Sequence, residues 1–197
     1  MKLNEYAPLN TGHLRADTTY IHPERLPEVV HLDSPALDVM TDFKSRPPVT
    51  TTKKVLIKDA IEDMKSAGVK SLFVIDSNDH IIGHVSALDL HGLKPSQIAS
   101  DYDIKVTEVT VGMMMTPFDK LPTLNYKYLQ SSSVGHIART LHDLGVNYLI
   151  VVEDVDGEEQ MVRGLFSILR IRRQLDDTFT GDFSSSTVAD MHKRIPD

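Results

Sequence analysis

Residues Gly83-His84-Val85-Ser86-Ala87-Leu88-Asp89 decide how this chain folds. The apolar residues that precede and enter this stretch predict a half-buried strand, which passes through small residues into a helix. Ser86 falls near the helix N-cap and Asp89 lies one turn later. The pair has two interpretations. Local pattern favours a capping box, and the alternative is a diol held between two side chains on one side of the helix start.

The same stretch occurs a second time, as Gly164-Leu165-Phe166-Ser167-Ile168-Leu169-Arg170. The glycine, the apolar residues and the serine return 81 positions later (164 minus 83), again after a predicted strand and before a predicted helix. The sequence therefore predicts two copies of one supersecondary unit. Arg170 stands where the first copy has Asp89.

Each copy predicts a short strand, an amphipathic helix, a β-hairpin and a second helix. In the first copy the apolar residues at Ile57, Ala60, Ile61 and Met64 have helical spacing, and Gly68 ends that helix. In the second copy the helix spans 134–141 and Gly145 ends it. The expected strands cover 49–52, 72–75 and 80–85 in the first copy, and 121–124, 148–152 and 161–166 in the second.

These units divide the chain into five expected segments. They are an irregular N-terminal arm over 1–33, a first repeat over 34–95, a connector over 96–108, a second repeat over 109–175, and a polar link with a short C-terminal helix over 176–197. The displacement between Gly68 and Gly145 is 77 (145 minus 68), so the second hairpin loop is four residues longer than the first.

Composition limits the function classes. The chain has 197 residues, 41% of them hydrophobic, and a net charge of -7, which argues against nucleic acid or anionic membranes as partners. The absence of cysteine excludes disulfides, thiolate nucleophiles and cysteine-ligated zinc. The longest apolar run, 148–152, is too short to span a bilayer, and no secretion signal is seen at the N-terminus. We therefore expect a cytoplasmic protein.

The predicted order of strands and helices, present in two complete copies, resembles the cystathionine-β-synthase (CBS) motif in tandem. This arrangement is called a Bateman module. The resemblance covers roughly residues 35 to 175 and includes Pro48-Val49-Thr50-Thr51, the amphipathic helix and both glycine-serine stretches. It implies an α/β (α+β) fold of tandem CBS repeats, each a small three-stranded mixed sheet with two helices, related by a pseudo-two-fold axis. It also implies a stand-alone, bacterial-type regulatory protein.

The resemblance further implies a regulatory ligand that contains adenosine: AMP, ADP, ATP or S-adenosylmethionine. Carried over to this chain, it makes Ser86 and Asp89 the residues that hold the ribose, because a carboxylate accepts charge-assisted bonds from both hydroxyls. The adenine cleft implied by the same resemblance consists of Gly83, His84, Val85, Thr123, Leu124, Val146, Asn147 and Tyr148.

The second copy departs from this pattern, because an arginine cannot accept a hydrogen bond from a diol. The corresponding second pocket comprises Thr51, Val69, Lys70, Ser167 and Arg170. This cleft has more than one interpretation. It is empty, or it is used differently, with Arg170 and Lys70 meeting a phosphate. Alternatively, Arg170, Arg172 and Arg173 only favour the C-terminal half of their helix by charge-dipole attraction. The last interpretation is the one that the local pattern favours.

No complete catalytic or metal-binding set is recognised. His136 and His142 lie six residues apart, away from the spacing of a zinc pair, and Ser131-Ser132-Ser133 predicts a helix N-cap. We expect no catalytic cofactor, no metal and no enzymatic activity. The expected function is an energy-sensing nucleotide sensor that forms a homodimer and presents an interface to an unidentified regulated protein. The alternative is a structural or interaction module whose clefts are vestigial.

Overall fold

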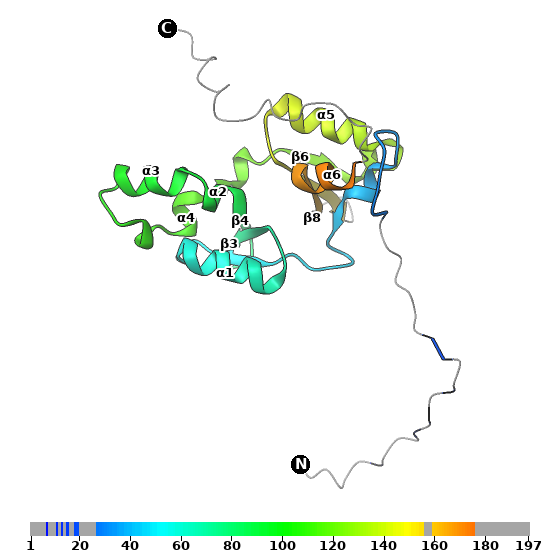
Figure 1. Ribbon diagram of the computed structural model, residues 1–197, viewed down its shortest axis with the longest axis horizontal. Helices are drawn as coiled ribbons and strands as arrows, with labels where there is room; N and C mark the ends of the chain where they lie inside the picture. Colours follow the sequence, from blue (N-terminus) through cyan, green and yellow to red (C-terminus); the bar gives the residue numbers. More distant parts are fainter. Residues whose placement is uncertain are drawn as a thin grey trace.

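Two β-hairpins form the centres of two four-stranded mixed sheets (Figure 1). The computed structural model describes Ala7, Thr11, His13, Arg15, Thr18, Thr19, residues 27–155 and residues 159–175. The first half of the molecule contains the sheet β2-β3-β4-β5, and the second half contains the sheet β1-β8-β7-β6. The predicted fold class, two mixed α/β repeats, is confirmed.

The elements of the first half are β2 (Thr50–Thr52), α1 (Ile57–Ala67), β3 (Ser71–Ile75), β4 (Ile81–Ser86), α2 (Ala87–His91), α3 (Lys94–Asp101), η3 (Val106–Glu108), α4 (Val111–Met114) and β5 (Thr116–Pro117). Those of the second half are η2 (Ala36–Val39), β1 (Thr41–Asp42), η4 (Phe118–Lys120), β6 (Thr123–Asn125), η5 (Tyr126–Ser131), α5 (Val134–Leu144), β7 (Tyr148–Val155), β8 (Glu159–Ser167) and α6 (Ile168–Gln174).

The predicted helices α1 and α5 form and end where the glycines require it. Gly68 and Gly145 adopt φ of 65° and 64°, and each N–H caps the preceding turn of its helix. A side chain is strained at such a positive φ, which is why glycine ends both helices. In both halves a parallel strand and an antiparallel hairpin then complete the three strands expected from the sequence.

Each sheet gains a fourth strand that the sequence analysis did not predict, and that strand comes from within the other expected repeat. β1 pairs with β8, and β5 pairs with β4. Figure 1 shows β1 beside the sheet of the second half, although it lies within the first repeat expected over 34–95. The proposed boundaries of the two repeats therefore stay a prediction, because residues 36–42 pack with the second half and residues 109–117 pack with the first half.

The glycine of each repeated stretch makes this exchange possible. A Cβ on Gly83 would lie 2.7 Å from the carbonyl oxygen of Thr116, and one on Gly164 would lie 2.5 Å from that of Thr41. These distances leave no room for a side chain. The first glycine of the motif thus allows a neighbouring strand to approach, which is a packing function.

Three clusters of buried apolar residues hold the fold together. One lies in the second half and includes Phe166 and Val39, and one lies in the first half and includes Leu72 and Val111. The third joins the two sheets and consists of Phe73, Ile150, Val152 and Leu165. The two halves are thus in contact through buried apolar side chains.

Pro35 is the N-cap of η2, and the Ser34 hydroxyl accepts a hydrogen bond from the His31 N–H at 2.9 Å. Residues 27–33 of the expected arm are described, and Val30 is buried against the second half. The predicted C-terminal helix lies outside the described residues.

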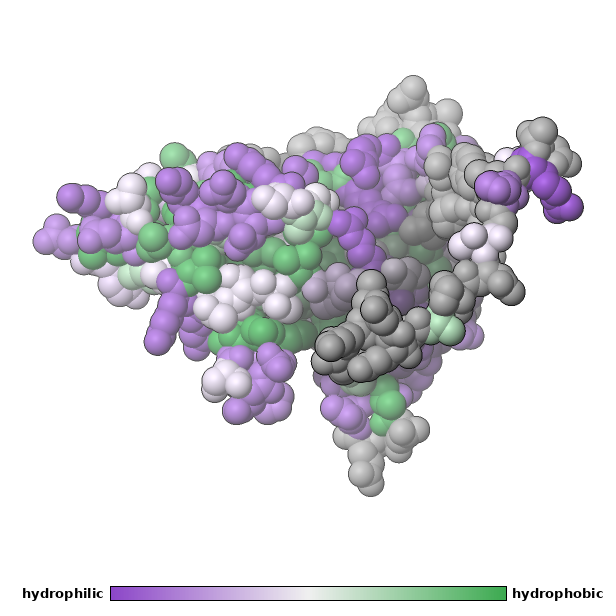
Figure 2. All heavy atoms as spheres, turned by 90° about the horizontal axis from the view of Figure 1, so that it is seen from below, coloured by the Kyte–Doolittle hydropathy of each residue, from purple (hydrophilic) through white to green (hydrophobic). Residues whose placement is uncertain are grey.

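Hydrophobic residues also reach the surface. Figure 2 shows them in a band across one face, with hydrophilic residues around it. Among the described residues, no helix is both long and apolar enough to cross a membrane.

Candidate functional site

The two repeated serines stand at equivalent ends of the two hairpins. Ser86 is the last residue of β4 and pairs with Ser71, the first residue of β3. Ser167 is the last residue of β8 and pairs with Tyr148, the first residue of β7. Paired residues in neighbouring strands project to the same face of a sheet. Each half therefore presents two side chains at the start of the helix that follows its hairpin, α2 in the first half and α6 in the second.

Ser86 and Asp89 form the capping box that the local pattern favours. The Ser86 N–H and hydroxyl both donate to Asp89 Oδ2, at 3.1 Å and 2.5 Å, and the Asp89 N–H donates to the Ser86 hydroxyl at 3.3 Å. Ser86 is buried and Asp89 is half-buried. No hydrogen bond to Asp89 Oδ1 is found among residues 27–155 and 159–175, so one carboxylate oxygen is available to a ligand. The ribose role of this pair stays a prediction.

His84 and Tyr148 lie in contact where the two halves meet. The His84 ring lies 5.3 Å from the Phe73 ring and 4.8 Å from the Tyr148 ring, centroid to centroid. Burial lowers the pKa of His84 to about 4, an effect that nearby Asp89 opposes. Its buried Nε2 atom has no hydrogen-bond partner. Burial also raises the pKa of Tyr148, while the hydroxyls of Ser86 and Ser167 near the phenol oppose this shift.

The other residues of the predicted adenine cleft differ in accessibility, from the buried Gly83 and Val85 to the exposed Thr123. Val85 is fully buried in the core of the first half, and Gly83 lies against the backbone of β5. Thr123 and Leu124 lie on β6, and the Asn147 carbonyl accepts a hydrogen bond from the Ile168 N–H at 3.0 Å. Val146 packs against the core of the second half. Of the ten residues predicted for this cleft, the structure brings Ser86, Asp89, His84 and Tyr148 together.

A cavity of about 480 Å³ lies in the other cleft, between the second copy of the motif and the first half. Four of the five residues predicted for the second pocket line it: Val69, Lys70, Ser167 and Arg170. Thr51 does not, because the middle residue of β2 points into the first half while its neighbours face solvent. Its hydroxyl is buried there without a hydrogen-bond partner.

The sequence analysis missed most of the cavity lining, which is Thr41, Phe43, Arg46, Pro47, Pro48, Val49, Gly68, Ser71, Phe73, Tyr148, Leu165, Leu169 and Arg173 in addition to the four residues above. Tyr148 was predicted, but for the first cleft. The Pro47-Pro48-Val49 segment precedes β2 and could have been found by comparison with Thr123 and Leu124, which start the equivalent strand.

Both apolar and positively charged residues line the cavity. Four cationic side chains line it, and none of the described lining residues carries a carboxylate. The four are Arg46, Lys70, Arg170 and Arg173. Arg170 is held in place, since its Nε donates to Gln174 Oε1 at 2.9 Å and one terminal nitrogen donates to Thr41 Oγ1 at 3.0 Å. Burial and the neighbouring charge of Arg173 lower the pKa of Arg170. A bound anion would compensate the Arg170 guanidinium both for its burial and for the repulsion from Arg173.

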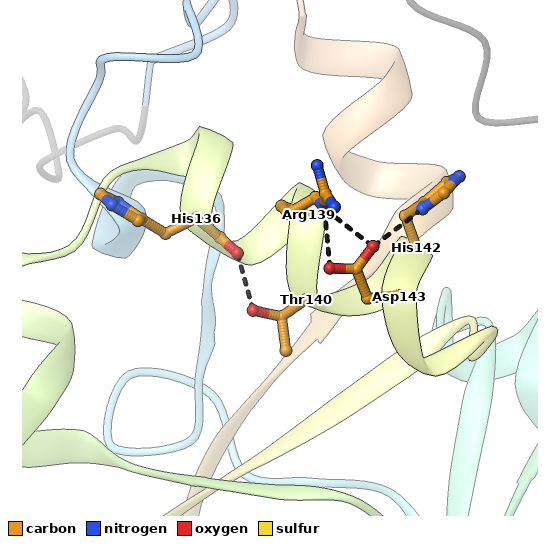
Figure 3. Close-up of polar contacts among 5 residues, drawn as sticks. All are labelled: His136, Arg139, Thr140, His142 and Asp143. Carbon is orange, nitrogen blue, oxygen red and sulfur yellow. Dashed lines mark hydrogen bonds and ion pairs between the residues drawn. The ribbon is translucent and has the colours of Figure 1, made fainter.

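The histidines of α5 do not form a site. Figure 3 shows the His136 ring at one end of the group, away from Arg139 and Asp143. The Ser133 N–H, at the N-cap of α5, donates to His136 Nδ1 at 3.1 Å. Arg139 Nε donates to Asp143 at 2.7 Å, and His142 lies 3.2 Å from the same carboxylate. Within the part of the chain that the structure describes, no three His, Asp or Glu side chains are grouped to hold a metal ion.

Comparison with known proteins gives a family for part of the chain. Residues 36–93 match the model of the CBS domain. No curated protein matches the chain. Its fold is similar to that of an uncharacterized conserved protein from Pyrococcus horikoshii, with 16% identity, a TM-score of 0.51, and coverage of 73% of this chain and 92% of that chain.

Two further solved structures are similar at lower TM-scores. CBSX2 from Arabidopsis thaliana in complex with AMP is 25% identical, with a TM-score of 0.47 and coverage of 71% of this chain and 94% of that chain. A putative signal-transduction protein with CBS domains from Burkholderia ambifaria MC40-6 is 22% identical, with a TM-score of 0.48 and coverage of 68% and 85%.

Proposed function

We propose that this chain, whose residues 36–93 match the model of the CBS domain, is a non-catalytic regulatory module that binds an adenosine-type nucleotide between its two halves. The observation that carries the proposal is the 480 Å³ cavity beside Ser167, with its apolar and cationic lining residues. That volume is in the range of small-molecule sites.

The two kinds of lining residue suit the two parts of a nucleotide. Val49, Val69 and Leu165 offer apolar surface to a base. Arg170 and Lys70 would meet phosphate oxygens, since a guanidinium fork matches phosphate geometry. The Ser167 hydroxyl, which lines the cavity, would bond a ribose hydroxyl. This assignment makes phosphate, more than ribose, the group that Arg170 recognises.

Isothermal titration calorimetry with AMP, ADP, ATP, S-adenosylmethionine and adenosine tests this assignment. If Arg170 holds a phosphate, Arg170→Ala should weaken ATP binding by roughly 1.5–3 kcal/mol, which is about 10- to 150-fold. Adenosine binding should change little. Arg139→Ala is the matched control, because it removes an exposed arginine of α5 that lies outside the cavity lining.

The Ser86–Asp89 pair is tested in the same assay. Asp89→Ala should leave ATP binding unchanged if the cavity beside Ser167 is the site. A loss caused by Asp89→Ala and not by Arg170→Ala would move the site to the first cleft. Unchanged binding in both variants would contradict the proposal in either form.

Regulation would follow from a difference in affinity between two arrangements of the halves, because a ligand shifts an equilibrium only through such a difference. Leu88, on α2, is 50% exposed. We propose that this apolar side chain belongs to a homodimer interface, from which the ligand signal reaches a regulated protein. Sedimentation of the Leu88→Asp variant as a monomer, beside a dimeric parent, is the expected result.

One observation favours the alternative function, a structural or interaction module. The capping box already engages Ser86 and Asp89, and Arg170 replaces the second carboxylate. A thermal-shift screen separates the two functions. A real site raises apparent stability by about 2.7 kcal/mol at one hundred times Kd. The absence of any shift across the panel would favour the structural module.

A further inference from the structure

We propose that Tyr148 makes the two clefts unequal: its side chain occupies the cleft of Ser86 and Asp89, so the chain binds one nucleotide, in the cavity beside Ser167. This inference rests on the proposed function and adds the residue that sets the number and location of the sites.

Strand register identifies Tyr148 as the counterpart of Ser71. Ser71 opens β3 and pairs with Ser86, and Tyr148 opens β7 and pairs with Ser167. Each cleft lies between the motif of one half and the strand start of the other. The open cavity therefore has the small Ser71 at its strand start and is bordered by Tyr148, whereas the first cleft has the tyrosine itself at the strand start.

The Tyr148 phenol lies over the residues that would hold a ribose in the first cleft. Its hydroxyl is near those of Ser86 and Ser167, and the Asp89 charge acts on it. A diol placed between Ser86 and Asp89 would have to displace this phenol. Ser86 also donates its hydroxyl proton to Asp89, so the pair is already satisfied in part from within the chain.

Aromatic packing holds Tyr148 in this position. Its ring is in contact with His84, which in turn packs edge-on against Phe73. These residues come from β7, β4 and β3, so both halves contribute. The second copy of the motif has Leu165 in place of His84, and Leu165 lines the open cavity. Aromatic pairs of this kind favour a defined ring orientation beyond their buried area.

Two reciprocal substitutions test the inference. Calorimetric titration of the full chain with ATP and AMP should give one site per chain for the parent, two for Tyr148→Ser and none for Ser71→Tyr. Tyr148→Phe, which keeps the ring, should retain one site. Adding Asp89→Ala to Tyr148→Ser should return the count from two to one, which places the new site in the first cleft. Circular dichroism melts confirm that each variant is folded.

The outcomes separate this inference from the proposed function. Two sites in the parent, one site in folded Tyr148→Ser, or an unaltered site in folded Ser71→Tyr would each overturn the role of Tyr148. If Tyr148→Ser does not fold, the decision passes to Ser71→Tyr and Tyr148→Phe. No binding of either nucleotide to the parent or to any folded variant would refute the proposed function itself.

Discussion

Protonation of His84 should destabilise the protein as the pH falls, by an amount that its burial determines. Burial lowers the pKa of His84 to about 4, against 6.5 for an unperturbed histidine. Between pH 4 and pH 6.5, His84 is therefore mostly protonated in the unfolded chain and mostly neutral in the folded chain. The stabilising effect of the neutral ring is complete above pH 6.5, declines as the pH falls toward 4, and amounts to about 3 kcal/mol in all.

The variant His84→Leu isolates this contribution, because the second copy of the motif carries Leu165 at the equivalent position. Between about pH 7.5 and about pH 5.5, the free energy of unfolding measured in urea should fall by roughly 1 kcal/mol more in the parent than in His84→Leu. At the higher pH the variant should be at least as stable, since it removes a buried nitrogen without a partner. Parallel pH profiles, or a His84 proton resonance in the folded chain that titrates near the unperturbed pKa, would refute the reasoning.

Two further predictions concern the stability of the fold. Gly83→Ala should destabilise by about 1–3 kcal/mol, because its Cβ would meet the β5 backbone, whereas Gly92→Ala, with its nearest atom at 3.5 Å, should be close to neutral in the same urea titration. Phe166→Ala empties a fully buried position and should cost about 3–5 kcal/mol. Leu93→Ala, at a side chain 77% exposed, should change the midpoint little, and equal effects of the two would contradict the placement of the core.

The repeat itself could be predicted from the sequence, because it is written in local patterns. Helical spacing of apolar residues located α1 and α5, and the glycines that end them need only the positive φ of a single residue. Ser86 and Asp89 were found as a pair because a capping box involves residues three apart. All of these are contacts between near neighbours in the chain.

The exchange of edge strands could not be predicted in the same way. β1 has only two residues, and its pairing with β8 joins Thr41 to Leu165, far apart in the sequence. A strand of two residues has no periodicity to detect. The same limit applied to Thr51, whose neighbours suggested a pocket while the actual start of β2 turned the side chain inward.

The sequence by itself determined that two similar units follow each other, where their helices end, and that the second copy exchanges a carboxylate for Arg170. Only the tertiary structure showed where the cavity of about 480 Å³ lies, beside Ser167. That location depends on how one half meets the strand start of the other, where Ser71 leaves space and Tyr148 packs on His84. Side-chain volume at an interface acts between residues that the chain order does not bring together, so packing alone determines it.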